Sequence, residues 1–443
     1  MSILRTRTLF IKRLGLICWF LGCSILGQAP VRDQGNTVRM DLRDALSRAR
    51  QNSQQLQSAS LDLSLAAEDR TQAKAALLPS LDYFNQSIYT QGNGTESGIF
   101  IANDGVHVYT SLAQVHQQIF SAERLAQYRR SIAAQALASA RRDIVERGLT
   151  VTVIQNYYAV LGDTRRMLNA QHTVEEANQF FEITQRLEEG GEVAHADVLK
   201  AQLVLEQSQR DLQEARLAVD KARIELAVIV FPDFRQDFNL VDDLASATAL
   251  PAYSAVEPSA SERSPELRAA QENLRQEEYG LAIARSAYLP SLSLDYFFGI
   301  NANQFAIQDP EGRNRLGSSV QATLSIPVWD WWSTRSKVRQ ADMRRQQAQL
   351  DLALAKKQFA SRLRTLHLEA EASLAALDSL RRSTEAAAES QRLTSLRYQA
   401  GEVTVLEVVD AQSTLAQARN AYDDGLVRYR LAVASIQALT GGF

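Results

Sequence analysis

The sequence has little cysteine, proline, glycine or histidine for its length. Its 443 residues include 2 Cys, 9 Pro, 20 Gly and 5 His. Both cysteines, Cys18 and Cys23, lie in the N-terminal leader described below, so we expect neither disulfides nor cysteine-bound metal in the rest of the chain. The histidines are scattered without the helical spacing of a metal-binding pair. The sequence therefore predicts no metal site, and we expect all five histidines at solvent-facing positions.

Motifs for catalysis and cofactor binding are also missing. The sequence contains no phosphate-binding Gly loop, nucleophile elbow or zinc motif, so it predicts no enzyme and no cofactor. A net charge of −3 gives no reason to expect nucleic acid binding. Beyond the N-terminus no run of about 18 apolar residues occurs, and no membrane-spanning helix is expected. Ala, Leu, Gln, Arg and Glu are abundant instead, which is typical of long helices and coiled coils.

The N-terminus resembles a secretory signal, with basic residues followed by an apolar run over 14–26. We expect a signal peptide over 1–29, cleaved after Ala29 behind the small residue Gly27. The alternative is a lipoprotein signal that ends before Cys23, with Cys23 lipidated, because FLGC (20–23) approximates a lipobox. Both interpretations predict that the chain leaves the cytoplasm.

The rest of the chain is duplicated at a spacing of about 210 residues. LPSL at 78–81 returns at 289–292, and GEV at 191–193 returns at 401–403. The order of elements is also the same in each copy. We therefore divide the chain into a first structural repeat (30–230), an inter-repeat linker (231–265) and a second structural repeat (266–443).

Each repeat is expected to hold a helix, a strand pair, a long helix and a return helix. In the first repeat these are helix 41–77, a strand pair over about 80–120, a long helix over about 122–188 and a return helix over about 192–230. In the second they are helix 266–287, a strand pair over about 291–328, a long helix over about 333–399 and a return helix over about 402–439. The Gly-, Asn- and Asp-rich segments 91–105 and 301–317 are expected loops. The linker contains four prolines and is expected to hold at most a short piece of local structure.

The strand segments alternate between apolar and polar residues. Val320, Ala322, Leu324 and Ile326 interleave with polar residues over 319–325. About ten residues of this pattern suit a tilted transmembrane β-strand. A soluble β-sandwich strand has the same pattern over one segment, so periodicity alone leaves both open.

The long segments 122–188 and 333–399 contain no proline and would each reach roughly 100 Å as helices. The return helices carry heptads that pair a large with a small residue. The large seam positions are Val198, Leu205, Leu212, Val219 and Leu226 in the first copy and Val408, Leu415, Tyr422, Tyr429 and Ile436 in the second. A cytoplasmic coiled-coil rod would give the same heptads, but the leader and the strands count against it.

Four strands cannot close a membrane barrel, since an open sheet edge is not tolerated in lipid. The smallest closed barrels have about 8 strands. If the strands are in the membrane, the chain must oligomerise.

The motif RYQAGEVTVLEVVDAQ (397–412) resembles the hallmark of the TolC-like outer-membrane efflux protein family (outer membrane factors). LRDAL (42–46), ALLPS (76–80) and IPVWD (326–330) are similar to further signatures of that family. The resemblance covers nearly everything after the leader. It implies an α+β membrane protein: a homotrimer with a 12-stranded β-barrel in outer-membrane lipid, continued by a periplasmic α-helical barrel. It also implies docking to a periplasmic adaptor and an inner-membrane pump, in efflux or type I secretion.

The resemblance also identifies candidate gate residues near the Gly401 turn. Glu407 and Asp410 are three residues apart on one helix face, and in a trimer they would ring the periplasmic mouth with carboxylates. A solvated charged face is the alternative interpretation. Tyr398 matches the family tyrosine that ties neighbouring hairpins in the closed state, and Asp197 matches its acidic partner.

The hairpin turns carry the residues expected at the tips and at the adaptor docking surface. These are Gly191, Gly401, Glu402 and Val403. Val403 departs from the family, because some members carry there the arginine of a closing salt bridge. Arg397 is a candidate substitute donor.

Three tryptophans, Trp329, Trp331 and Trp332, lie where the last strand meets the long helix. They form either an aromatic girdle at the membrane interface or a core patch. For the whole chain the leading hypothesis is a passive exit duct gated by acids at its periplasmic tip. The alternative is a periplasmic coiled-coil adaptor or a structural protein without a pore.

Overall fold

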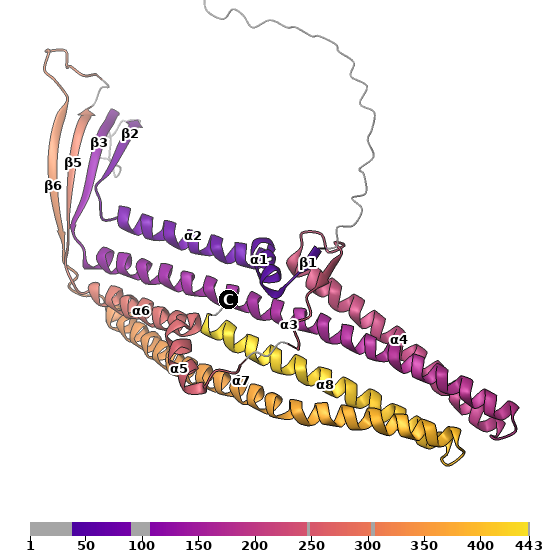
Figure 1. The fold of residues 1–443 in the computed structure, drawn as a ribbon. Helices are drawn as coiled ribbons and strands as arrows, with labels where there is room; N and C mark the ends of the chain where they lie inside the picture. The colour runs from indigo at the N-terminus through magenta and orange to yellow at the C-terminus, as the bar shows by residue number, and fades with distance from the viewer. Residues whose placement is uncertain (1–37, 90–106, 246–248, 303–305, 442–443) are drawn as a thin grey trace, which may run out of the picture.

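A computed structural model describes residues 38–89, 107–245, 249–302 and 306–441. The expected leader with its candidate lipidation site Cys23 and the expected loop 91–105 lie outside these residues. The chain is elongated, with strands at one end and two long helical hairpins reaching the other end (Figure 1). This arrangement confirms the four strands and two long helical hairpins per chain that the sequence predicted.

The strands form one four-stranded sheet with the order β2-β3-β5-β6, in which every neighbouring pair is antiparallel. Their bounds are Ser80–Tyr89 (β2), His107–Phe120 (β3), Ser291–Ala302 (β5) and Gly317–Ser325 (β6). The central pair β3–β5 joins the two repeats. β2 and β6 are the edges of the sheet, and each pairs on one side only within the described chain.

In the half of the sheet nearest the helices, cross-strand partners alternate between apolar and polar rows. One row runs through all four strands as Leu81, Val115, Tyr296 and Val320. The next row is Ser80, His116, Asp295 and Gln321. Because partners share a face and successive residues alternate between faces, one face here is apolar and the other polar. The two faces of the sheet therefore differ in polarity, as expected for a wall between lipid and water.

The expected helix 41–77 is two helices, α1 (Leu42–Asn52) and α2 (Gln54–Ala75). Ser53 breaks it with an extended backbone, and its Oγ accepts a hydrogen bond of 3.2 Å from Leu56 N. The prediction of one continuous helix was therefore wrong, because a serine here caps a new helix. Asn52 Nδ2 donates to Val230 O at 2.7 Å and fixes the break against the return helix.

Two helical hairpins dominate the molecule. The long helices are α3 (Ala122–Glu189) and α7 (Ser333–Gln399), and their return helices are α4 (His195–Val230) and α8 (Val405–Thr440). The predicted heptad seams are buried, in particular at Val198, Leu205, Val219, Leu226, Val408, Leu415, Tyr429 and Ile436. The main contact between the hairpins is α3 against α8, and α6 (Pro265–Ser286) lies along both α3 and α7.

The linker holds more structure than the sequence suggested. It contains β4 (Phe238–Leu240), which pairs in parallel with β1 (Val38–Met40), and α5 (Tyr253–Arg263). Phe238 and Leu244 are buried in one core cluster with Met40 and Tyr157. This linker therefore packs onto the middle of the hairpins.

His367 of α7 lies beneath the linker and corrects a sequence expectation. It is 3% exposed, and its Nε2 lies 3.0 Å from the carbonyl oxygen of Pro251. The expectation that all five histidines face solvent is wrong for this residue.

Among the described residues, no helix is long and apolar enough to cross a membrane.

Candidate functional site

The two hairpin tips lie together at the end of the molecule opposite the sheet (Figure 1). Both tips have the same turn. Gly401 N donates to Tyr398 O at 3.0 Å, and Glu402 N donates to Arg397 O at 2.9 Å. Gly191, with φ 77°, matches Gly401, with φ 74°. This hydrogen-bond pattern is the Schellman motif, and its left-handed residue explains why each tip carries glycine.

A side-chain contact closes each tip within its own hairpin, an ion pair in the second and a hydrogen bond of histidine in the first. Arg397 Nε lies 3.3 Å from Glu402 Oε2, and His195 Nδ1 lies 2.7 Å from Glu188 Oε1. Arg397 is thus engaged by its own turn. Val403 is part of the apolar cluster at the tips, so it contributes packing at this position instead of a charge.

Glu407 and Asp410 lie on the exposed side of the first turns of α8. Glu407 Oε1 accepts hydrogen bonds from Thr404 N at 3.2 Å and Thr404 Oγ1 at 3.3 Å. Glu407 is therefore also part of a capping box that begins α8. Val405 and Val408 of the same turns face the protein core. The two carboxylates consequently point away from the hairpin packing, where they are free to act on an approaching ion.

Tyr398 links the second hairpin to the first. It is 4% exposed, and its ring lies 5.1 Å from the ring of Phe180 in α3. Ala201 of α4 and Val408 of α8 complete this cluster. Burial raises the pKa of Tyr398, and the charge of Asp197 on α4 raises it further, while the nearby Thr184 hydroxyl acts in the opposite direction. Asp197 therefore lies within electrostatic reach of Tyr398.

A ladder of polar contacts along α3 and α8 continues from the tips toward the middle of the molecule. Arg419 Nη1 lies 3.0 Å from Glu176 Oε1, and Arg166 Nη2 lies 2.8 Å from Asp424 Oδ1. Between them, Asn169 Nδ2 donates to Asp423 Oδ2 at 2.9 Å. Sequence reasoning missed these residues, because a heptad shows that a helix has a neighbour without identifying that neighbour.

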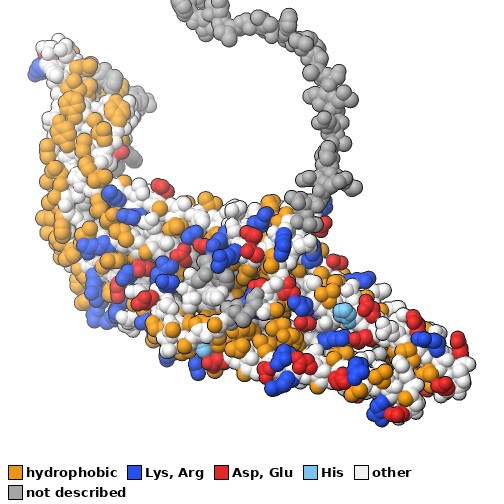
Figure 2. Space-filling view, in the orientation of Figure 1, with side chains coloured by type: hydrophobic (Ala, Val, Ile, Leu, Met, Phe, Trp, Pro, Cys, Tyr) orange, Lys and Arg blue, Asp and Glu red, His pale blue; other side chains and the backbone are white. Residues whose placement is uncertain are grey.

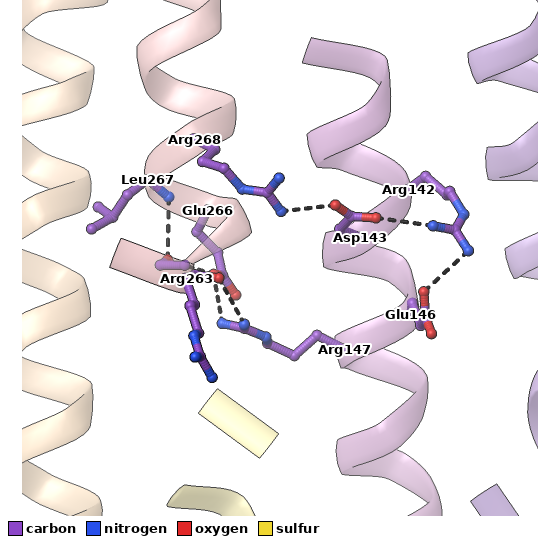
Figure 3. A network of polar contacts seen from close by, with 9 residues as sticks. Arg142, Asp143, Glu146, Arg147, Arg263, Glu266, Leu267 and Arg268 are labelled. Atoms are coloured by element: carbon purple, nitrogen blue, oxygen red, sulfur yellow. Dashed lines mark hydrogen bonds and ion pairs between the residues drawn. The ribbon is translucent and has the colours of Figure 1, made fainter. Parts of the chain in front are cut away.

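A second polar network holds α6 against α3 midway along the molecule (Figure 3). Arg147 Nη1 lies 3.4 Å from Glu266 Oε2, and its Nη2 donates to Arg263 O at 3.1 Å. Arg268 Nη2 lies 2.8 Å from Asp143 Oδ2. Burial lowers the pKa of Arg147, but a guanidinium stays charged in proteins. These contacts hold α6 against α3, one of the two long helices that lead to the tips.

No metal centre accompanies this site in the described ranges, where no group of three or more His, Cys, Asp or Glu side chains could hold an ion. The tip is therefore a surface of carboxylates, glycine turns and packed aromatic rings. Such an arrangement can attract or repel ions.

A family sequence model described as "Outer membrane efflux protein" matches residues 45–230 and 257–442. The two matched segments correspond to the two repeats. The alkaline protease secretion protein AprF of Pseudomonas aeruginosa is 23% identical over 96% of this chain and 88% of its own length. The pyoverdine export outer membrane protein OpmQ of the same organism is 24% identical over 91% of this chain and 85% of its own length.

Solved structures share the whole fold. The outer-membrane channel OprN superposes with a TM-score of 0.82 at 20% sequence identity, over 91% of this chain and 90% of its own.

Proposed function

The chain belongs to the outer membrane efflux protein family, and on this premise we propose that three copies assemble into one passive exit duct. The chain is an outer-membrane protein and serves as an exit duct. The finer features proposed below are its assembly, its gate and its partners.

The observation that carries the assembly is the open four-stranded sheet, and the family resemblance supplies the number of copies, three. β2 and β6 are unpaired on their outer sides within the described chain, and lipid does not tolerate such edges. Pairing β6 of one copy with β2 of the next removes both edges. Three copies then give a closed 12-stranded barrel, which is within the range of known outer-membrane barrels.

The two rows of the sheet support the orientation of this wall. The row with Tyr296 and Val320 would face lipid, and the row with His116 and Asp295 would face the water-filled interior. His116 Nδ1 lies 2.7 Å from Asp295 Oδ1, so this polar row satisfies part of its own hydrogen bonding. Below the barrel, six hairpins from three copies would continue the wall as a helical tube.

The proposed gate is the end of this tube. Glu407 and Asp410 of three copies would contribute six carboxylates to a narrow mouth, favouring cations and resisting close approach by repulsion. Tyr398, packed on Phe180 and close to Asp197, would hold the second hairpin against the first in the closed state. The first copy has Lys200 where the second has Asp410, so only the second hairpin has a doubly acidic tip.

The partners follow from the absence of an energy source in the duct. Transport through it must be driven by an inner-membrane pump, connected by a periplasmic adaptor. The docking surface would be the glycine turns at the tips, with Gly191 on one hairpin and Gly401, Glu402 and Val403 on the other. Their exposed backbone offers close approach to the tip of a partner hairpin.

A reconstitution experiment tests the proposal. Protein extracted with detergent from outer membranes is expected to run at the mass of three chains and to form cation-selective channels in planar bilayers. Crosslinking in cells is expected to link the tips to a periplasmic protein. A monomer that is soluble without detergent and conducts no current would overturn the proposal.

A further inference from the structure

The two repeats differ sharply where a strand meets a long helix. In the first repeat β3 ends at Phe120, and Ser121 immediately caps α3 by accepting from Arg124 N at 3.2 Å. In the second, seven residues separate β6 from α7 (326–332). This segment contains Trp329, Trp331 and Trp332. The second repeat therefore has a segment between its last strand and its long helix that the first repeat lacks.

The three tryptophans pack on one another and leave most of their surface exposed in the chain. Trp329 is 62% exposed, Trp331 83% and Trp332 61%. The ring of Trp329 lies 5.9 Å from that of Trp331 and 5.5 Å from that of Trp332. This exposure favours the girdle interpretation over the core patch. An exposed cluster of large aromatic rings marks a binding surface.

Two of the three tryptophans have an unfavourable backbone conformation. Trp331 has φ 55° and Trp332 has φ 66°, which is the left-handed region that bulky residues rarely adopt. Asp330 holds the turn, because its Oδ2 accepts from Thr334 N at 2.7 Å. Glycine would fit both positions better, so the two tryptophans are not there to ease the turn.

Basic side chains adjoin the tryptophans. Arg335 lies with its guanidinium carbon 5.3 Å from the centre of the Trp332 ring, and Arg339 follows one helical turn later. Both are exposed, as is Lys337. Residues 333–341 contain no acid. Figure 2 shows Lys and Arg side chains gathered where the apolar strand surface meets the helices.

The apolar surface of the sheet continues into this junction. Val320 and Leu324 lie on the apolar face of β6, and Ile326 and Val328 extend the exposed apolar surface beyond the strand, at 60% and 88% exposure. A molecule that binds here must therefore have an apolar part that contacts the tryptophan rings and an anionic group that contacts the neighbouring basic side chains. A lipid with an anionic headgroup has this combination.

The geometry points to a binding surface for anionic phospholipid, formed by Trp329, Trp331, Trp332, Arg335 and Arg339. The rings lie at the acyl–headgroup boundary of the periplasmic leaflet, and the two arginines contact the phosphate. This inference rests on the proposed membrane-spanning barrel and adds the class of lipid that the junction selects. Each cation near a membrane surface enriches anionic lipid roughly fivefold.

The tryptophan content of the chain makes the test direct. The fourth and last tryptophan, Trp19, lies in the expected leader. In trimers that begin after residue 29, all tryptophan emission therefore comes from this surface. The trimers are reconstituted in phosphatidylcholine vesicles that contain a fixed fraction of brominated lipid, either phosphatidylglycerol or phosphatidylcholine. Bromine quenches only rings that it contacts.

We expect stronger quenching by brominated phosphatidylglycerol than by brominated phosphatidylcholine, and a smaller difference at high salt. Arg335→Gln with Arg339→Gln should abolish the difference while leaving quenching by phosphatidylcholine intact. Lys356→Gln with Lys357→Gln, the same loss of charge farther along α7, is the matched control and should behave like the wild type. Equal quenching by the two lipids in wild-type trimers would overturn the selectivity, and absence of quenching would overturn the surface itself.

A conductance measurement separates this inference from the proposed function. Single-channel conductance of wild-type trimers in planar bilayers reports on the exit duct independently of any lipid preference. If wild-type trimers conduct and yet show no lipid preference, the inference fails and the exit duct stands. If the protein forms neither trimers nor channels, the proposed function fails first.

Discussion

The ring of Tyr398 on α7 packs against the ring of Phe180 on α3, with centroids 5.1 Å apart. This contact crosses from the second hairpin to the first near the tips. It shows that the two hairpins pack against each other at the proposed gate. A change in this ring should therefore alter how firmly the tips are held.

Replacing Tyr398 with alanine is expected to loosen the tips. The change empties part of a buried aromatic cluster, and truncations of this kind cost about 3–5 kcal/mol. We expect higher single-channel conductance in planar bilayers and faster cleavage by trypsin at the neighbouring Arg397. Tyr398→Phe keeps the ring and should stay close to the wild type. Identical conductance for the alanine variant and the wild type would refute a role in closure.

Neutralising the acidic tip is expected to reduce cation selectivity, because fewer cations gather at the mouth. Glu407→Gln with Asp410→Asn removes two charges per chain, while the glutamine can still accept from Thr404 and keep the cap of α8. Glu407→Ala would remove the charge and the cap together, so the effect of the charge alone could not be measured. The measurement is the reversal potential across a salt gradient.

The matched control for that variant is Asp211→Asn with Glu214→Gln. These acids have the same spacing on α4, are exposed, and lie farther from the tip. The control should leave the reversal potential unchanged. If both double variants change it equally, the effect is a general one of net charge, and Glu407 and Asp410 do not line a constriction.

The sequence predicted the long helices closely, but it did not predict how one hairpin packs against the other. The predicted helix 122–188 corresponds to Ala122–Glu189 and the predicted helix 333–399 to Ser333–Gln399. These bounds could be read because proline is absent from the interiors and glycine marks the tips. The contact between α3 and α8 could not be predicted from the sequence. Its ion pairs Arg419–Glu176 and Arg166–Asp424 join residues more than 200 positions apart, and no local pattern connects them.

At the candidate site, position along the chain was predictable and hydrogen bonding was not. The tip motif located Glu407 and Asp410, but it did not show that Glu407 caps α8 while Asp410 does not. The break at Ser53 was missed for a similar reason. Serine is common within helical patterns, and only the contact of Asn52 with Val230 makes this one a cap.

Breaking the contact between Asp243 and Arg430 is expected to destabilise the middle of the molecule. Arg430 of α8 has a side chain that is 10% exposed, and it pairs with Asp243, which also accepts from Tyr158 Oη at 3.2 Å. Asp243→Ala leaves a largely buried cation without this partner and should cost about 2–4 kcal/mol. Thermal unfolding followed by circular dichroism measures the loss. Asp378→Ala, at an exposed ion pair, should cost less than about 1 kcal/mol.

Stability is expected to fall at alkaline pH through the tyrosines of the same region. Burial, with the charge of Asp243, raises the pKa of Tyr158 to about 12 from an ordinary 10.0, and it also raises the pKa of Tyr157. Because the folded-state pKa lies above the unfolded one, this stabilisation is complete below pH 10 and is lost as pH rises through about 12. The unfolding temperature should drop across this range.

Tyr158→Phe should make that drop shallower, since it removes one of the two titrating groups. Tyr288→Phe, at a ring that is 55% exposed, is the control and should follow the wild type. An unfolding temperature that is flat from pH 10 to 12 in the wild type would contradict the prediction.

Barrel formation is expected to depend on Gly299 and to tolerate change at its cross-strand partner, Gly317. A Cβ atom at Gly299 would lie 2.1 Å from Ser111 O, whereas one at Gly317 would meet nothing within 4 Å. Because the obstacle at Gly299 is backbone of the neighbouring strand β3, Gly299→Ala must displace the β3–β5 pairing that joins the two repeats. We expect Gly299→Ala to reduce trimers in outer-membrane fractions severalfold, while Gly317→Ala assembles normally. Equal trimer yields would mean that the sheet shifts without loss, and that the close approach of β3 and β5 is not required for closure.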